Sequence, residues 1–89
     1  MLHTINTVCH NRGMRIRFAA SARRHGIKKD QIRYAIDNAT TTREATLPSG
    51  DPAYFMVGPD EDGTELEVIA VVEPTGLYVI HAMINRGKE

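Results

Sequence analysis

Two side chains in the stretch VIHAMINR, residues 79–86, are candidates for catalysis. His81 lies inside an apolar run, and Arg86 follows at its end. A histidine can accept or donate a proton near neutral pH, and an arginine supplies fixed positive charge to an anion. His81 is therefore either a core histidine with one hydrogen bond or half of a site that Arg86 completes.

A basic segment, MRIRFAASARRHGIKK (residues 14–29), could bind phosphate groups. Arginine side chains contact phosphate in bidentate geometry and hold a nucleic-acid backbone without reading its bases. The candidates in this segment and the helix after it are Arg15, Arg17, Arg23, Arg24, Lys28 and Arg33. His25, next to Gly26, either donates to carbonyls at a helix end or belongs to a site. The alternative for the whole segment is a solvated basic face.

The net charge of zero hides an uneven distribution of charge along the chain. Residues 1–43 carry nine Lys and Arg against two Asp, a balance of +7, and residues 44–89 carry the opposite balance of −7. Such a division predicts a dipolar surface with a basic patch for phosphates. The other interpretation is that the acidic half pairs with the basic half.

Several classes of protein are disfavoured by the sequence. Cys9 is the single cysteine, which fits a reducing, cytoplasmic setting without an intramolecular disulfide. No apolar run is long enough to span a membrane or to form a signal peptide. His3, Cys9 and His10 match no structural zinc pattern, so no metal or other cofactor is expected. With 89 residues the chain is expected to form one domain at 14–89, after a polar, disordered tail at 1–13.

The pattern predicts an α+β fold in which two N-terminal helices pack on one face of a small antiparallel sheet. Residues 14–18 alternate as a strand, with Arg15 and Arg17 on one face. A short helical turn, AASARRHG, precedes a helix in which Ile32, Ala35, Ile36 and Ala39 form one apolar stripe. Further strands follow at about 41–47, 53–58, 64–73 and 77–85, which gives the order β-α-α-β-β-β-β.

Strict alternation in the last strand predicts which side chains face the helices. Tyr78, Ile80, Ala82 and Ile84 are the more aliphatic set and are expected to meet them. His81 is then expected on the opposite face with Leu77, Val79 and Met83. A shift of register by one residue would reverse this assignment.

Taken in order, three stretches resemble the small BrnT-like toxins of the RelE/ParE superfamily. They read ARRHGIKKDQIRYAI, FMVGPDEDGTELEVIAVVE and GLYVIHAMINR, and the resemblance spans about residues 14–87. The family has a Lys/Arg-His-Gly junction before a helix, then a glycine-containing hairpin and a last strand that ends near arginine. Met83 stands where the family has arginine, which leaves Arg86 as the arginine near the strand end.

The resemblance implies the toxin of a type II toxin–antitoxin system, a metal-independent endoribonuclease that cuts mRNA and arrests growth. The RNA 2′-hydroxyl would attack the adjacent phosphate, which needs a base, an acid and positive charge. His81, Arg86 and His25 are the expected catalytic residues. The expected RNA contacts are Arg15, Arg17, Arg23, Arg24, Lys28 and Arg33.

The same resemblance implies partners. A cognate antitoxin is expected to bind over Leu77, Val79 and Met83, and operator DNA would be bound only through the antitoxin. The substrate is RNA, free or on the ribosome, and no membrane is involved. The competing hypotheses are a ParE-like module that poisons a protein target such as gyrase, and a small structural or regulatory domain.

Overall fold

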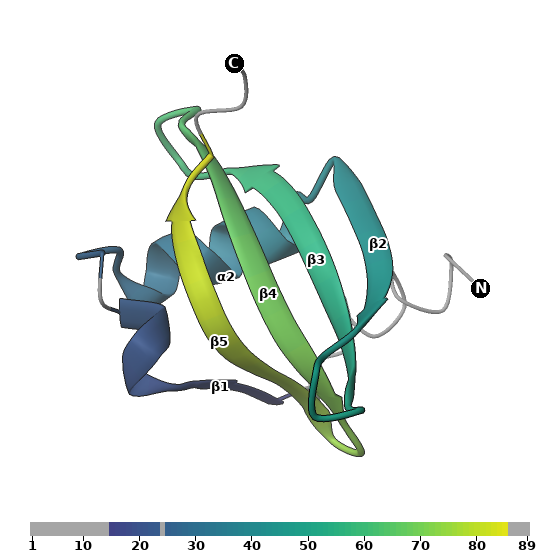
Figure 1. Ribbon diagram of the computed structural model, residues 1–89. Helices are drawn as coiled ribbons and strands as arrows, with labels where there is room; N and C mark the ends of the chain where they lie inside the picture. The colour runs from purple at the N-terminus through teal and green to yellow at the C-terminus, as the bar shows by residue number, and fades with distance from the viewer. Residues whose placement is uncertain (1–14, 24, 86–89) are drawn as a thin grey trace.

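The fold is a single five-stranded sheet with one α-helix packed on one face (Figure 1). The computed structural model describes residues 15–23 and 25–85. The elements, in chain order, are β1 (Arg15–Phe18), the 3₁₀ helix η1 (Ala20–Arg23), α2 (Lys29–Asp37), β2 (Thr41–Thr46), β3 (Pro52–Pro59), β4 (Glu65–Glu73) and β5 (Gly76–Ile84). The strand order across the sheet is β1-β5-β4-β3-β2.

The prediction of two helices on an antiparallel sheet is wrong in both parts. The segment AASARRHG forms only the four-residue η1, because Gly26, at a φ of 78°, turns the chain before an α-helix can develop. The sheet is mixed, since β1 pairs in parallel with β5 while the other neighbours are antiparallel. The β1–β5 pairing joins strands far apart in sequence, so no local pattern specifies it.

The core lies between α2 and the sheet. The stripe on α2 is buried as its spacing predicts, with Ile32, Ala35 and Ile36 at most 2% exposed. At Gly58 on β3 a Cβ atom would lie 2.2 Å from the Ala35 carbonyl oxygen, so the helix touches the sheet backbone there. A glycine at this position therefore permits the close approach of α2 to β3.

A β-bulge in β5 sets which of its side chains face the helix. Ile69 pairs with His81 and Ala70 pairs with Val79, so Ile80 is the extra residue between them. Before the bulge Leu77 and Val79 point into the core, and after it Ala82 does. Without the extra residue His81 would share the core face with Val79, because side chains alternate along a regular strand.

The expected phase of β5 is therefore wrong before the bulge and correct after it. Leu77 and Val79 are 5% and 0% exposed, so they are core residues. Tyr78 lies on the opposite face, which carries no helix formed by the described residues and which we call the helix-free face. His81 also lies there, as expected, although it reaches this face through the bulge.

Half-buried apolar side chains line the helix-free face across β3, β4 and β5. Figure 1 is viewed from this side, with α2 behind β3 and β4. The members, placed by strand register, are Phe55, Val57, Ile69, Val71, Tyr78 and Met83. Among the residues that the structure describes, no helix is long and apolar enough to cross a membrane.

Candidate functional site

Two histidines and a glutamate lie close together on the helix-free face, near β5. The His81 Nε2 atom lies 2.9 Å from Oε2 of Glu67, and both side chains are about a quarter exposed. The His25 ring is 6.1 Å from the His81 ring, centroid to centroid, in an edge-to-face arrangement. We call His25, Glu67 and His81 the histidine cluster.

Hydrogen bonding fixes how the His81 ring can act. An ionised carboxylate only accepts hydrogen bonds, so the contact with Glu67 requires a proton on Nε2. The Nδ1 atom is then the position that can exchange a proton with a ligand. A carboxylate that orients an imidazole in this way is the arrangement found in acid–base catalysis.

Local structure brings His25 to His81. After β1 the chain enters η1, and η1 packs against β5. The Ser21 hydroxyl donates to the carbonyl oxygen of Ile80, the bulge residue, at 2.7 Å, and the Ala19 amide donates to Val79 at 2.8 Å. These two bonds attach the segment before His25 to the strand that carries His81.

Arg17 and Tyr78 form a second arrangement on the helix-free face, where β1 meets β5. The Arg17 guanidinium makes two hydrogen bonds to Glu73, at 3.1 and 2.6 Å, and lies 4.4 Å from the Tyr78 ring centre. The hydrogen bond from Arg17 holds the pKa of the Glu73 carboxyl below its ordinary value of 4.5. The same hydrogen bond raises the pKa of Arg17.

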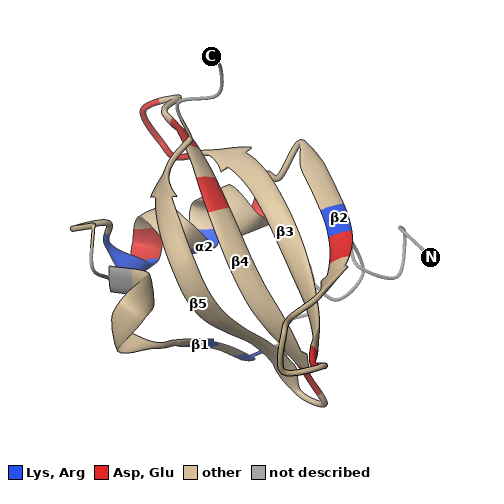
Figure 2. Ribbon diagram, viewed as in Figure 1, with Lys and Arg blue, Asp and Glu red and all other residues tan. Residues whose placement is uncertain are grey.

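The other basic residues expected to bind RNA are spread over the molecule. Arg15 is exposed on β1, Lys28 is exposed just before α2, and Arg33 is exposed on α2, on the other side of the sheet from His81. Figure 2 shows this distribution, with acidic residues at the β3–β4 turn and on β4 and others on α2 and β2. Arg23 lies in η1. Arg24 and Arg86, like the tail at 1–13, lie outside the described residues.

The residues expected to bind an antitoxin do not form one surface. Met83 is half-buried on the helix-free face, whereas Leu77 and Val79 are in the core. The expected surface is therefore corrected to exclude these two residues.

Two features of the helix-free face are not found from the sequence alone. Glu67 meets His81 diagonally across β4 and β5, and Arg43 lies with its guanidinium carbon 5.4 Å from the Phe55 ring centre. Both pairs depend on the register between strands, which alternation within one strand does not specify. The alternation of β4 does predict from the sequence that Leu66 and Val68 share one face and that Glu67 lies on the other, but it does not predict the partner of Glu67.

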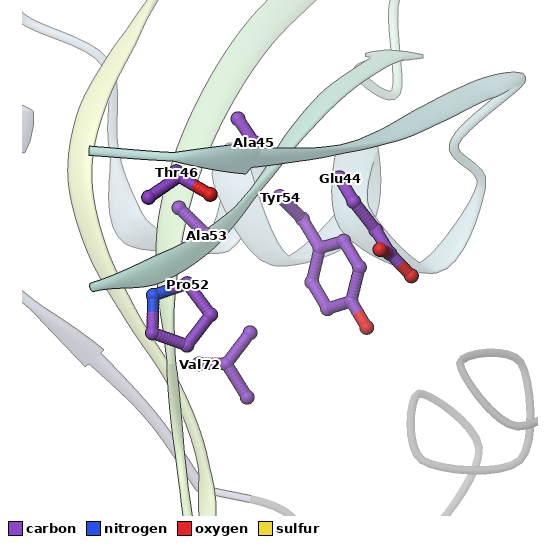
Figure 3. A pocket seen from close by; sticks show the side chains of 7 residues that line it. All are labelled: Glu44, Ala45, Thr46, Pro52, Ala53, Tyr54 and Val72. Carbon is purple, nitrogen blue, oxygen red and sulfur yellow. The ribbon is translucent and has the colours of Figure 1, made fainter. Parts of the chain in front are cut away.

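An open pocket of about 540 Å³ lies on the other face of the sheet, beyond the part that α2 covers (Figure 3). Its lining residues are Glu44, Ala45, Thr46, Pro52, Ala53, Tyr54 and Val72. Neither His25 nor His81 lines it. Across residues 15–23 and 25–85, no three His, Cys, Asp or Glu side chains are grouped so as to hold a metal ion.

One family model matches this chain, over residues 18–84. The chain belongs to the family DUF4258, a domain of unknown function. The DUF4258 match extends from the end of β1 to the end of β5 and includes the whole histidine cluster. No curated protein and no solved structure matches the chain. Membership of DUF4258 thus assigns no activity, and the function has to be argued from the site.

Proposed function

We propose that the protein is an endoribonuclease that cleaves RNA without a metal, by attack of the 2′-hydroxyl on the adjacent phosphate. The observation that supports this most is the histidine cluster, in which two imidazoles lie 6.1 Å apart and Glu67 orients one of them. Two imidazoles at this separation can flank one phosphate, one to remove a proton and one to supply it.

In the proposed reaction His81 is the base and His25 the acid. Nδ1 of His81 takes the proton of the 2′-hydroxyl, and the oxygen forms a bond to phosphorus. His25 donates a proton to the departing 5′-oxygen as its bond to phosphorus breaks. The products are a 2′,3′-cyclic phosphate and a 5′-hydroxyl end.

Positive charge near the phosphate would stabilise the transition state, in which negative charge gathers on the phosphoryl oxygens. Arg86, which follows β5 in the sequence, is the residue we assign to this role. Lys28 lies three residues after His25 and would contact a flanking phosphate. Both assignments belong to the proposal.

The biological role in the proposal is that of a growth-arresting toxin in the cytoplasm, inhibited by a cognate antitoxin. The support is the resemblance of residues 14–87 to BrnT-like toxins, together with a cluster that suits RNA cleavage. Operator DNA would be bound by the antitoxin and not by this chain.

The test uses the purified protein and a short DNA strand that contains one ribonucleotide. We expect cleavage at that ribonucleotide, with a cyclic phosphate product, and no cleavage of the all-DNA strand. His81→Ala should lower kcat by about 10²- to 10⁴-fold. Glu65→Gln, an exposed change on the same strand as Glu67, should leave kcat unchanged.

Induction of the protein in bacteria tests the biological role. Growth arrest with cleaved mRNA is expected for wild type, and His81→Ala should remove both effects. Arrest with intact mRNA and a DNA-damage response would instead indicate a protein that poisons a target such as gyrase. Cleavage of the all-DNA strand, or full activity of His81→Ala, would overturn the proposed mechanism.

A further inference from the structure

A row of four side chains crosses the helix-free face and ends at the histidine cluster. Direct pairing connects Arg43 on β2 to Phe55 on β3, Phe55 to Ile69 on β4, and Ile69 to His81 on β5. Residues paired in this way lie on the same face of the sheet. We call Arg43, Phe55, Ile69 and His81 the cross-strand row.

The far end of the row has the chemistry of a base-stacking site. The Phe55 ring is partly exposed on the sheet surface, and the Arg43 guanidinium lies 5.4 Å from its centre. Aromatic rings and guanidinium planes are the groups on which unpaired bases stack, and such stacking accepts any base. The exposed Arg43 side chain is long enough to swing away and cover a base that lies on Phe55.

The distance along the row suits a nucleotide close to the cleavage point. Phe55 lies two strands from His81, which corresponds to about 10 Å at the usual spacing of neighbouring strands. Ile69 fills the space between them with an apolar surface. A strand whose phosphate lay at the histidines could therefore extend across the sheet and place a nearby base on Phe55.

The charges on this face also fit a polyanion. Of the acidic side chains near the row, Glu73 forms a salt bridge with Arg17, and Glu67 accepts a hydrogen bond from His81. Within the described part of the chain, Arg43 takes part in no salt bridge, so its charge is available to a phosphate. The acidic β3–β4 turn lies at the end of the sheet and outside the row.

We propose that the cross-strand row is a platform for single-stranded RNA, on which Phe55 and Arg43 stack a base close to the cleaved nucleotide. This rests on the proposed nuclease function and names its substrate as unpaired RNA. Duplex RNA would bind poorly, because its bases are already stacked on one another. Phe55 would contribute affinity and placement, while the histidines perform the chemistry.

The test separates binding from cleavage by using a fluorescent 2′-O-methyl RNA, which has no free 2′-hydroxyl and is not cut. Fluorescence anisotropy of the wild-type protein should show binding to the single strand and weaker binding to the same sequence as a duplex. Phe55→Ala should weaken binding about 5- to 150-fold. Tyr34→Ala, which removes an exposed ring on α2, should bind like wild type.

Conservative variants keep the proposal testable if Phe55→Ala fails to fold. Phe55→Trp should bind at least as tightly as wild type, and Arg43→Ala should bind more weakly. A 2-aminopurine base in the same RNA should be quenched at one position near the cleavage point, and Phe55→Leu should abolish this quenching.

Unchanged binding by Phe55→Ala and Arg43→Ala, or no binding by wild type, would overturn the platform. Neither result decides the nuclease proposal, which is tested separately by cleavage of the ribonucleotide-containing strand. Loss of cleavage there, with stacking intact, would overturn the nuclease and retain a single-stranded RNA-binding surface. If Phe55→Ala and Arg43→Ala weakened binding to a protein partner and left RNA binding unchanged, that result would also contradict the platform.

Discussion

At the scale of single residues, Glu67 is the side chain that gives His81 a defined orientation. Glu67 accepts a hydrogen bond from Nε2 of His81 at 2.9 Å, and this bond is what joins it to the histidine cluster. It therefore acts through His81 and is a positioning residue in the proposed reaction. Its effect should appear in the rate of the chemical step and not in binding.

Glu67→Gln should lower kcat by about 10- to 100-fold, equivalent to about 1.4–2.7 kcal/mol, with KM nearly unchanged. The amide can still contact the ring but no longer carries the charge that favours one orientation. Cleavage of the single-ribonucleotide strand measures both constants. A large rise in KM, or an unchanged kcat, would contradict this role.

At the scale of elements, the bulge in β5 decides which face His81 occupies. Ile80 is the extra residue, and its carbonyl oxygen is held by the Ser21 hydroxyl from η1. Bulges occur beside active sites because they redirect a side chain without ending the sheet. In this chain the bulge lets one strand supply Val79 to the core and His81 to the opposite surface.

Ser21→Ala should reduce the free energy of unfolding by about 0.5–1.5 kcal/mol, because the part-buried Ile80 carbonyl loses its donor. It should also reduce the proposed cleavage activity, since η1 connects the bulge to His25. Urea denaturation and kcat measure the two effects. Ser49→Ala, in the exposed loop before β3, is the control and should change stability by less than about 0.5 kcal/mol. Equal effects of the two variants would contradict a role for Ser21 at the bulge.

The elements show how far the sequence predicts this fold. The spacing of Ile32, Ala35 and Ile36 and the alternation of Leu66 and Val68 predict buried faces correctly, because each pattern is local. The bulge at Ile80 leaves no local signal, and this is why Leu77 and Val79 were expected on the wrong face. Likewise, His25 and His81 are recognisable by residue type, whereas Glu67 and the Arg43–Phe55 pair emerge only from the register of the strands.

At the scale of the whole molecule, few of the opposite charges on described residues of the two halves are paired with one another. Among the described residues, Arg17 of the basic half forms a salt bridge with Glu73 of the acidic half. Lys28, Arg33 and Arg43 are exposed. Neutralisation by described residues of the acidic half therefore does not account for Lys28, Arg33 and Arg43, whose charges lie on different parts of the surface.

The Arg17–Glu73 pair gives stability a specific dependence on pH. Because the folded pKa of Glu73 is below its ordinary value of 4.5, the pair stabilises the fold above that pH and is lost as the pH falls through the folded pKa. Glu73→Gln should therefore be less stable than wild type at pH 7, and the difference should shrink as the pH falls through the folded pKa of Glu73. The effect should be small, since the Arg17 side chain is largely exposed to solvent. Urea unfolding across a series of pH values measures it, and Glu65→Gln is the control.

The parallel pairing of β1 with β5 also determines when the protein can finish folding as it is made. Arg15 pairs with Gly76, so the first described strand has no neighbour until the last one has been synthesised. The hairpins from β2 to β4 can form earlier from residues close together in the chain. His25 meets His81 only at this final step, so a nascent chain in which β5 has not yet been made lacks the histidine cluster.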